Sequence, residues 1–433
     1  MPSLVFACYA VVSYGVSPTT SLGHWMSVDQ AGLPDLTDET FLSGDRTQEY
    51  LELRAMGAAV PLPTADGVPT WLVSHHADVA ALNRLPETRL QPAGAVAPEW
   101  LDEGPALQRL KANLSQIDAP AHTRLRKVVG PMFIPRRVEQ FRELATDSVR
   151  RAIERLLART DVVDAVQDLA VDVPKGVICS FLGIPEEDWG ILTKDQHDFL
   201  LIFSPMPIDG AQKSALDQIT QFYLDYFDEF VSSRSLEQHS PFVRLVLEAE
   251  RASEISHIEA LSLLHTVLDA GYETTRTSIS NAVQLLGQHP HILGALREEP
   301  GLVTNIVEEF LRYRTPVHVR VRFLTDNYVA SDGTVLAAGS KVILMLAAAN
   351  RDGAVFSNAD ELDILRENAG SHQAFGGGLH HCLGAPIARI QLQETLLGLA
   401  DAFSHIELCD GSHRYPDLMF PALMALPVRF HTA

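Results

Sequence analysis

The chain has 433 residues, of which 46% are hydrophobic and 21% charged, and 34 Lys and Arg stand against 55 Asp and Glu, for a formal net charge of -21. This composition is typical of a globular protein with a sizeable core rather than of a disordered chain. The acidic balance argues against a nucleic-acid-binding protein, which needs a basic face, and against a protein that lies on an anionic membrane.

The first residues carry a short apolar segment, 4–12, which is too short to span a bilayer. No Lys or Arg precedes Arg46, so the basic region of a signal peptide is missing. The sequence has four cysteines, Cys8, Cys179, Cys382 and Cys409. Their spacing shows no pairs, which indicates a reducing compartment. We therefore expect a cytoplasmic protein in which residues 1–25 are a dispensable tail before a start at Met26, and residues 26–433 form a single domain.

The N-terminal part alternates short strand patterns with turns. The dipeptide Asp66-Gly67 predicts a turn, and residues 70–73 predict a strand that leads into a helix over 76–82. From 139 to 157 apolar residues recur at helical spacing. Prolines and a glycine interrupt the stretch 199–210, which predicts a flexible connection between two helices.

The second half of the chain begins with a long predicted helix over 256–286, which Gly287 and Pro290 end. Another helix is predicted over 304–313, before Pro316. Segments of strand-like composition and a hairpin turn follow: 317–324, 334–335 and 341–346, with the turn at Asp332-Gly333. The expected fold class is therefore mainly α with small β-sheets.

The strongest local pattern is the loop 374–384, Ala-Phe-Gly-Gly-Gly-Leu-His-His-Cys-Leu-Gly. Its glycines allow tight bends and a close approach of backbone amides. A helical pattern begins directly after Cys382, so the sulfur lies near a helix N-terminus, where the dipole and free amides favour the thiolate. A thiolate held in this way is the ligand that a haem iron needs if it is to cleave dioxygen.

From the residues alone, three other interpretations of Cys382 stay open. It could be a buried structural cysteine. It could bind zinc together with His380 and His381, although adjacent ligands point in different directions and no fourth ligand lies at standard spacing. It could also be a nucleophile with a histidine base, although no known arrangement of that kind is present.

The loop resembles the haem-binding signature of the cytochrome P450 family, Phe-Gly-x-Gly-x-His-x-Cys-x-Gly, at every fixed position. The matching residues are Phe375, Gly376, Gly378, His380, Cys382 and Gly384. This resemblance implies a cytochrome P450 fold over roughly residues 35–430, haem b as the cofactor and Cys382 as its axial iron ligand.

A second pattern is the spacing of three between Glu309 and Arg312, which brings a carboxylate and a guanidinium onto one face of a helix. Alone, such a spacing is most often a solvated surface pair. In the P450 family the Glu-x-x-Arg pair is buried behind the haem and joins an arginine from a later Asp-x-x-Arg stretch, which Asp363 to Arg366 resembles. The resemblance implies that Glu309, Arg312 and Arg366 hold the cysteine loop in place.

A third pattern lies inside the long helix, where Ala270-Gly271-Tyr272-Glu273-Thr274-Thr275 is unfavourable on helix propensity. Threonine hydroxyls there can bond to the preceding turn and open the helix locally. Close packing against a neighbouring helix at Ala270 and Gly271 is the alternative. The stretch resembles the oxygen-binding groove of the family, in which Glu273 and Thr274 would be the acid and alcohol that deliver protons to dioxygen.

The carboxylates of a haem need cationic partners. His122 and Arg126 match the His-x-x-x-Arg contacts that the family makes with the haem propionates, and Arg322 and His380 match the other two. Each of these residues alone could be an ordinary surface charge. The resemblance implies that the four act together.

Family position also suggests a substrate pocket that includes His318 and Arg320 on a strand and the turn at Met419 and Phe420. Asp269 stands where relatives commonly carry an aliphatic residue. We hypothesise a polar or ionisable substrate whose donor or amine contacts Asp269. Alternatively, Asp269 turns away from the pocket and pairs with a neighbour.

The resemblance implies a monooxygenase that activates O2 and oxidises a small organic substrate, in bacterial secondary metabolism. The chain has no recognisable flavin or iron–sulfur segment, so the electrons would come from a ferredoxin and an NAD(P)H-dependent ferredoxin reductase. A basic patch is formed by Arg124, Lys127, Arg136 and Arg137. It could attract an acidic partner protein, or it could be an ordinary solvated surface. The alternatives are a coupling or nitrating oxidation, a peroxide-driven oxidation, and a non-enzymatic haem sensor or carrier.

Overall fold

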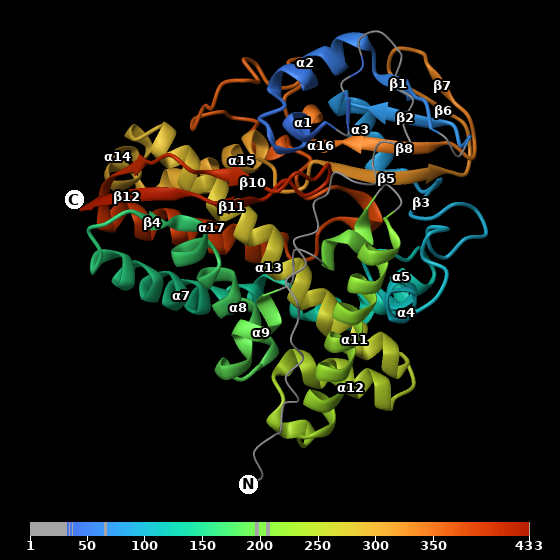
Figure 1. Ribbon diagram of the computed structural model, residues 1–433, viewed down its shortest axis with the longest axis horizontal. Coiled ribbons are helices and arrows are strands. Elements are labelled where there is room, and N and C mark those ends of the chain that lie inside the picture. Colours follow the sequence, from blue (N-terminus) through green and yellow to red (C-terminus); the bar gives the residue numbers. More distant parts are fainter. Residues whose placement is uncertain are drawn as a thin grey trace.

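The computed structural model describes residues 33, 35, 36, 38–64, 67–194, 199–204 and 208–432. The predicted tail at 1–25, the start at Met26, part of the turn at Asp66-Gly67 and the prolines of the 199–210 connection lie outside these residues. Figure 1 shows a large helical part beside a smaller part built around a β-sheet.

The main sheet has five strands in the order β1-β2-β8-β5-β3. Their bounds are β1 (Ala59–Leu62), β2 (Thr70–Val73), β8 (Lys341–Met345), β5 (Val319–Leu324) and β3 (Thr88–Arg89). Strands β2 and β8 are parallel and the other neighbours are antiparallel. The strands predicted at 70–73 and 341–346 are confirmed within one residue, whereas the strand predicted from 317 begins at Val319. Four helices belong to this part of the fold: α1 (Glu39–Ser43), α2 (Thr47–Met56), α3 (His76–Arg84) and α16 (Leu346–Ala349).

Smaller sheets complete the β structure of the described residues. A three-stranded sheet has the order β4-β12-β9, and two further pairs are antiparallel, β10 with β11 and β6 with β7. Their bounds are β4 (Val163–Asp164), β12 (Pro427–Thr432), β9 (Phe403–Leu408), β10 (His413–Arg414), β11 (Leu423–Ala425), β6 (Tyr328–Val329) and β7 (Val335–Leu336). The hairpin turn predicted at Asp332-Gly333 joins β6 to β7, and Gly333 has φ +88°, a conformation that favours glycine.

Helices form most of the remaining structure. Their bounds are α4 (Pro105–Ala112), α5 (Ala121–Val129), α6 (Pro135–Val138), α7 (Gln140–Leu157), α8 (Asp172–Leu182), α9 (Trp189–Thr193), α11 (Gly210–Ser232), α12 (Pro241–Arg251), α13 (His257–Gln288), α14 (His291–Glu298), α15 (Val303–Tyr313) and α17 (Ala385–Ala402). The helices predicted at 76–82, 139–157, 256–286 and 304–313 are α3, α7, α13 and α15.

The long helix α13 crosses the centre of the molecule and contacts α4, α8, α11 and α17 (Figure 1). Its start is fixed by a capping box, in which the Ser256 side chain accepts from the Glu259 amide and the Glu259 side chain bonds back to the Ser256 amide. Its N-terminal half, with Leu264 and Leu268, packs into one apolar cluster, and its C-terminal half, with Ile279, packs into another. A helix that is buried on nearly all sides belongs to the core of a large domain.

None of the helices in the described part of the chain is long and apolar enough to cross a membrane.

Candidate active site

The loop that carries Cys382 is folded back on itself and docked on α3. The Cys382 amide donates to the carbonyl of Phe375 at 3.0 Å. Gly378 has φ +60°, and a Cβ at this position would lie 2.7 Å from the carbonyl oxygen of Asn83 and 2.9 Å from the Cα of Arg84. Because these neighbours are backbone atoms that cannot easily move, only glycine allows the loop to approach α3 this closely.

The electrostatics of Cys382 differ from the prediction made from the sequence. Desolvation raises the pKa of the Cys382 thiol, while the Arg320 guanidinium, the Gly384 amide and the Arg126 guanidinium lower it to a smaller extent. The amide at the start of the following helix does favour the thiolate, as the spacing indicated, but burial outweighs it. Coordination to a metal ion would reverse this balance, because a coordinating thiol is deprotonated.

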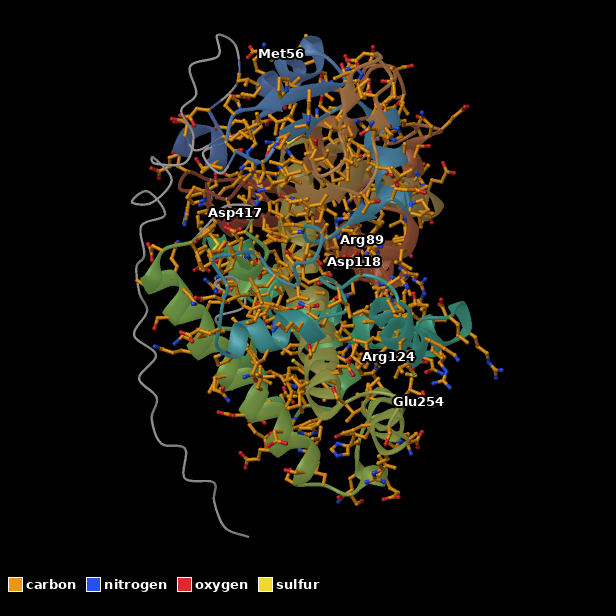
Figure 2. All side chains as sticks on the ribbon, turned by 90° about the vertical axis from the view of Figure 1, so that its right-hand side faces the viewer. Met56, Arg89, Asp118, Arg124, Glu254 and Asp417 are labelled. Carbon is orange, nitrogen blue, oxygen red and sulfur yellow. The ribbon has the colours of Figure 1, made fainter. Side chains whose placement is uncertain are left out.

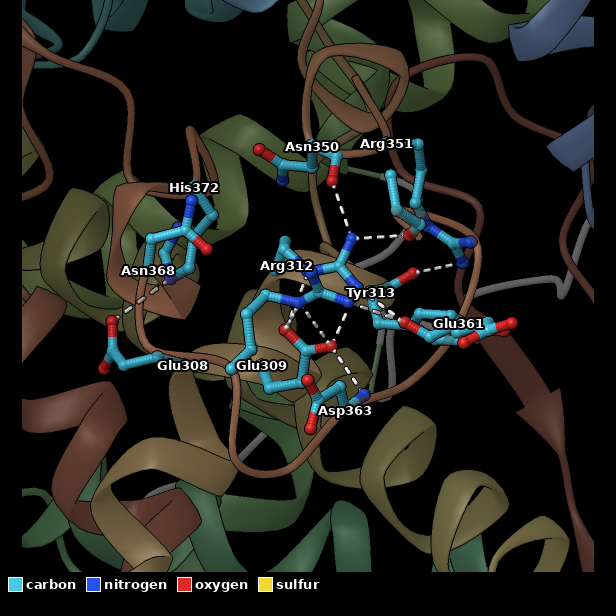
Figure 3. Close-up of polar contacts among 12 residues, drawn as sticks. Glu308, Glu309, Arg312, Tyr313, Asn350, Arg351, Glu361, Asp363, Asn368 and His372 are labelled. Atoms are coloured by element: carbon cyan, nitrogen blue, oxygen red, sulfur yellow. Dashed lines mark hydrogen bonds and ion pairs between the residues drawn. The ribbon is translucent and has the colours of Figure 1, made fainter. Parts of the chain in front are cut away.

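Glu309 and Arg312 form a buried ion pair (Figure 3), and Arg366 joins them in an ionic cluster. The Glu309 carboxylate accepts from Arg312 at 2.7 and 2.8 Å and from Arg366 at 3.1 and 3.2 Å. Arg312 also donates to the carbonyls of Asn350 and Glu361, so most of its donors are used. These contacts join α15 to the segment before the cysteine loop, and the pair is not a solvated surface pair.

A neighbouring contact was not foreseen. Arg389, in the first turns of α17, donates to Glu308 at 2.6 and 2.8 Å, and its guanidinium carbon lies 4.4 Å from the centroid of the Phe375 ring. Glu308 therefore ties α15 to the helix that follows Cys382, while the adjacent Glu309 serves the buried cluster. In the sequence, this contact is indicated only by the two adjacent glutamates, Glu308 and Glu309, and they do not specify the partner of Glu308.

Helix α13 has an accessible stripe in its middle. Val267, Ala270, Gly271 and Thr274 remain accessible although most residues around them are buried. Their spacing of three and four places them on one face of the helix. The Thr274 hydroxyl donates to the carbonyl of Ala270 at 2.8 Å, as predicted, but the helix continues without a break, so the predicted local opening is absent. A Cβ on Gly271 would lie 2.8 Å from the Ile178 side chain, so close packing against α8 is also present.

Glu273 is held away from this stripe. Its carboxylate forms a buried, two-point ion pair with Arg276, of which the longer contact, from Nε, measures 3.0 Å. Arg276 in turn donates to the carbonyl of Leu423 on β11 at 2.9 Å. Glu273 and Thr274 are neighbours in the sequence, but in the structure their side chains have different partners.

The residues matched to propionate contacts lie close to the cysteine loop. The rings of His122 and His380 have centroids 4.3 Å apart. Desolvation lowers the pKa of His122 to about 4 and that of His380 to about 2, so both are neutral at neutral pH. Arg126 donates to the carbonyls of Leu379 and His381 at 3.2 and 2.8 Å, which anchors α5 to the loop.

Several polar atoms at this place are buried without a hydrogen-bond partner among the described residues: Nδ1 of His122, Nε2 of His380 and Nε of Arg320. Arg322 is 3% exposed, and burial lowers its pKa to about 9. Buried polar groups are almost always hydrogen-bonded in native proteins. Unsatisfied nitrogens and guanidinium groups beside a cysteine sulfur fit a cofactor that brings its own acceptors, and a haem with its two propionates has this chemistry.

Asp269 does not face an open pocket. Its carboxylate forms an ion pair with Arg109 of α4, with 2.5 Å between Nη2 and Oδ2, and the same guanidinium donates from Nε to His265 at 2.8 Å. Desolvation raises the pKa of Asp269 to about 6 against the pull of Arg109. The structure therefore shows the alternative, in which Asp269 pairs with a neighbour, and contact between Asp269 and a substrate amine stays a hypothesis that would require this pair to open.

His318 is also engaged within the protein. Its Nδ1 lies 2.8 Å from the Tyr50 hydroxyl, and its backbone amide donates to the carbonyl of Met419 at 2.8 Å. The Phe420 ring lies 6.0 Å from the ring of Phe203, which comes from η6 (Leu200–Phe203). Three segments expected around the pocket thus meet, but the His318 ring already has a partner.

The basic patch is only partly free. Arg124 forms an ion pair with Glu259 at 2.5 Å and donates to the carbonyl of Glu254 at 2.8 Å (Figure 2). Lys127 and Arg136 are exposed. A partner of opposite charge would therefore meet fewer uncompensated cations than the sequence indicates.

The amino-acid sequence matches a family model described as "Cytochrome P450" over residues 190–430. The cytochrome P450 monooxygenase PikC of Streptomyces venezuelae is 33% identical over 393 residues, which covers 90% of this chain and 92% of PikC. The mycinamicin VIII C21 methyl hydroxylase of Micromonospora griseorubida is 32% identical over 351 residues, which covers 81% of this chain and 87% of that enzyme. The crystal structure of CalO2 superposes with a TM-score of 0.83 at 28% identity, and the match covers 93% of this chain and 99% of CalO2.

Proposed function

This chain belongs to the cytochrome P450 family of monooxygenases, and from this premise we propose that it holds haem b through Cys382 and oxidises a small organic substrate with O2. One observation carries the assignment of the site. The glycine-built loop holds Cys382 near basic residues with buried nitrogens that lack partners within the described part of the chain, on His122, His380 and Arg320. A haem bound there supplies both the metal that the sulfur needs and the acceptors that these nitrogens lack.

The cofactor supplies the activation of dioxygen, and the thiolate of Cys382 favours cleavage of the oxygen–oxygen bond. His122, Arg126, Arg322 and His380 would hold the haem propionates, because neutral imidazole N–H and guanidinium groups donate to carboxylates.

The two faces of the cofactor would meet different parts of the fold. Phe375 and Gly376 would border the face on the side of the cysteine. Ala270 and Gly271, on the accessible stripe of α13, would border the opposite face.

Thr274 is the residue on this stripe with a transferable proton. Its hydroxyl donates to the carbonyl of Ala270, so it has an oxygen lone pair available to accept a proton and a rotation available to pass one on. Glu273 would be the acid that resupplies this proton, which requires its carboxylate to leave Arg276 and turn toward the stripe. Thr274 therefore acts on dioxygen directly, and Glu273 acts through Thr274.

The electrons would come from a separate ferredoxin and its NAD(P)H-dependent reductase. Lys127 and Arg136 are exposed cations near α5 and α6 in an otherwise acidic chain, and they suit an acidic partner. Two relatives, PikC and the mycinamicin VIII C21 methyl hydroxylase, support a substrate from bacterial secondary metabolism.

A carbon monoxide difference spectrum of the reduced protein tests the assignment. We expect the red-shifted Soret band of a thiolate–haem complex in the wild type and in Cys409→Ala, a variant that removes a thiol at the end of β9. Cys382→Ala should lose this band. A folded, haem-loaded wild-type protein that shows only the band of a neutral axial ligand would contradict the role of Cys382.

A further inference from the structure

A cleft with a basic wall lies where the ends of α1, α13 and α15 meet strand β10. Its volume is about 230 Å³, and its wall includes the polar residues Ser43, Asp45, Gln284, Arg314, Ser412 and Arg414. Pockets that hold drug-sized ligands measure about 300–1,000 Å³, so this cleft suits a smaller group. None of these residues belongs to the candidate active site.

The positive charge of Arg414 in this wall is held by neutral partners. Its Nη1 donates to the carbonyl of Pro421 at 3.0 Å, and its Nη2 donates to the side-chain oxygens of Asn281 and Gln284 at 3.0 and 2.8 Å. Burial lowers the pKa of Arg414 to about 10, and the nearby Arg314 guanidinium adds to this lowering. Arg414 therefore stays charged at neutral pH, in surroundings that lack a compensating anion.

A second guanidinium of this kind, that of Arg46, acts electrostatically on Arg414. Arg46 is 2% exposed, and its hydrogen-bond acceptors include the carbonyls of Phe41, Leu418 and Asp417. Within the described part of the chain it forms hydrogen bonds but no ion pair. Its charge therefore adds to the positive potential around the cleft.

The negative charge at the cleft is too small to balance these cations. Asp45 is the only carboxylate among the described residues of the wall, and it forms an ion pair with Arg314, with 2.6 Å between Oδ2 and Nη2. Nε of Arg314 is buried and has no hydrogen-bond partner among the described residues. A local excess of positive charge thus lies in a chain whose formal net charge is -21. Such a cleft attracts an anion.

We propose that this cleft binds a phosphate group, either as the free anion or as a phosphate monoester. Guanidinium groups bind phosphate through paired, charge-assisted hydrogen bonds. The donors come from different segments, since Arg314 follows α15, Arg414 lies on β10 and Ser43 ends α1. A phosphate has oxygens that point in several directions and can use such a set, whereas one guanidinium already satisfies a planar carboxylate. This inference does not depend on the proposed function.

The test measures the binding of inorganic phosphate to the haem-loaded full chain. Equilibrium dialysis with radiolabelled phosphate is carried out at fixed pH, with sodium chloride keeping the ionic strength constant. Arg314→Gln removes a cation from the wall, and Asp45→Asn removes its carboxylate. The exposed ion pair of Arg159 and Asp161, at 2.8 Å, supplies the matched controls Arg159→Gln and Asp161→Asn.

We expect the wild type to bind phosphate with a Kd on the order of 1 mM. Arg314→Gln should weaken binding about tenfold, because a hydrogen bond between charged groups is lost. Asp45→Asn should tighten binding about fivefold, because a negative charge close to the anion is removed. Damage to the fold would not produce such a gain. Both control variants should bind phosphate like the wild type.

Three results would each overturn the proposal: no detectable binding to the wild type, equal binding in the wild type, Arg314→Gln and Asp45→Asn, or displacement of the label by acetate as readily as by unlabelled phosphate. Glycerol phosphate distinguishes the two sources of the group. Displacement by a lower concentration of glycerol phosphate than of inorganic phosphate would support a monoester, and weaker displacement would support the free anion. Absence of the thiolate band would overturn the proposed function and leave this inference in place.

Discussion

Arg109 of α4 and Asp269 of α13 form an ion pair in the interior, with 2.5 Å between Nη2 and Oδ2 and side chains that are 0% and 4% exposed. The guanidinium carbon of Arg109 also lies 4.2 Å from the centroid of the Phe199 ring. The pair therefore joins α4, the helix that carries Thr274 and the segment before α11. One buried pair of charges therefore holds three segments near the expected pocket together.

Removal of either partner should destabilise the fold strongly. Asp269→Leu leaves the Arg109 charge buried and uncompensated, and Arg109→Met does the same to Asp269. We expect each single variant to lower the free energy of unfolding by about 3–5 kcal/mol, and the double variant to lose less than either. Denaturant unfolding measures both, with haem content as a check on folding.

The exposed pair Arg150 and Glu154 on α7 provides the control, because the same removal there should leave the free energy of unfolding nearly unchanged. If the losses of the two single variants at the buried pair simply add in the double variant, the two side chains are not coupled and this account of the pair is incorrect.

The docking of the cysteine loop should depend on Gly378. An alanine there needs a left-handed backbone, at about 1–3 kcal/mol, and also meets the backbone of α3 at Asn83 and Arg84. We expect Gly378→Ala to reduce haem loading and to weaken the thiolate band in the carbon monoxide spectrum. Gly353→Ala is the control, because Gly353 is exposed, lies outside the cysteine loop, and has no atom of the described residues within 4 Å of a Cβ at that position. Normal haem loading in Gly378→Ala would show that the loop can dock elsewhere.

Local sequence patterns predicted the parts of the fold that local interactions determine. The long helix α13 was expected over 256–286, and Ser256 with Glu259 fixes its start. The helix runs to Gln288, so Gly287 lies within its last turn and Pro290 follows its end. The spacing within Glu309 and Arg312 predicted a contact that is present, because positions three apart share a helix face. The third member, Arg366, could be expected only from the resemblance to a family.

Contacts between distant segments could not be predicted in this way. Arg109 and Asp269 are 160 positions apart, and neither local sequence specifies the other. Asp269 therefore looked like an unusual charge in a pocket, although its partner makes it part of the core. The partner of His318 could not be predicted for the same reason, since Tyr50 comes from a helix near the start of the described chain.

Thr274 should control how efficiently electrons are used for product. Thr274→Ala removes the hydroxyl that passes protons while leaving the helix intact, since alanine favours helix more than threonine does. We expect NAD(P)H consumption to continue with the ferredoxin system, while product formed per NAD(P)H falls by at least about tenfold and hydrogen peroxide is released. Thr274→Ser keeps a hydroxyl and should recover much of the coupling. Unchanged coupling in Thr274→Ala would exclude a proton-delivery role.

Removal of the haem should make stability depend on pH near neutrality. Burial lowers the pKa of His122 to about 4 and that of His380 to about 2, whereas both titrate near 6.5 in an unfolded chain. As the pH falls below about 6.5, the unfolded chain takes up protons that the folded apoprotein cannot, so the folded state loses stability. Burial also lowers the pKa of His265 and His318, which adds to the effect.

Asp269 has the opposite effect on the pH dependence of stability and makes that dependence smaller. Its pKa of about 6 in the folded state lies above the ordinary value of 3.8, so its contribution weakens the fold as the pH rises between these values. Several histidines outweigh one carboxylate, and we expect the Tm of the apoprotein to fall by on the order of 5 °C between about pH 7 and about pH 5.

Bound haem should reduce this fall, because its propionates give protonated His122 and His380 a partner of opposite charge. Calorimetry of both forms, with the double variant His122→Gln/His380→Gln, measures the difference. A Tm that falls equally in the apoprotein and the haem-loaded protein would mean that these two imidazoles do not face the propionates.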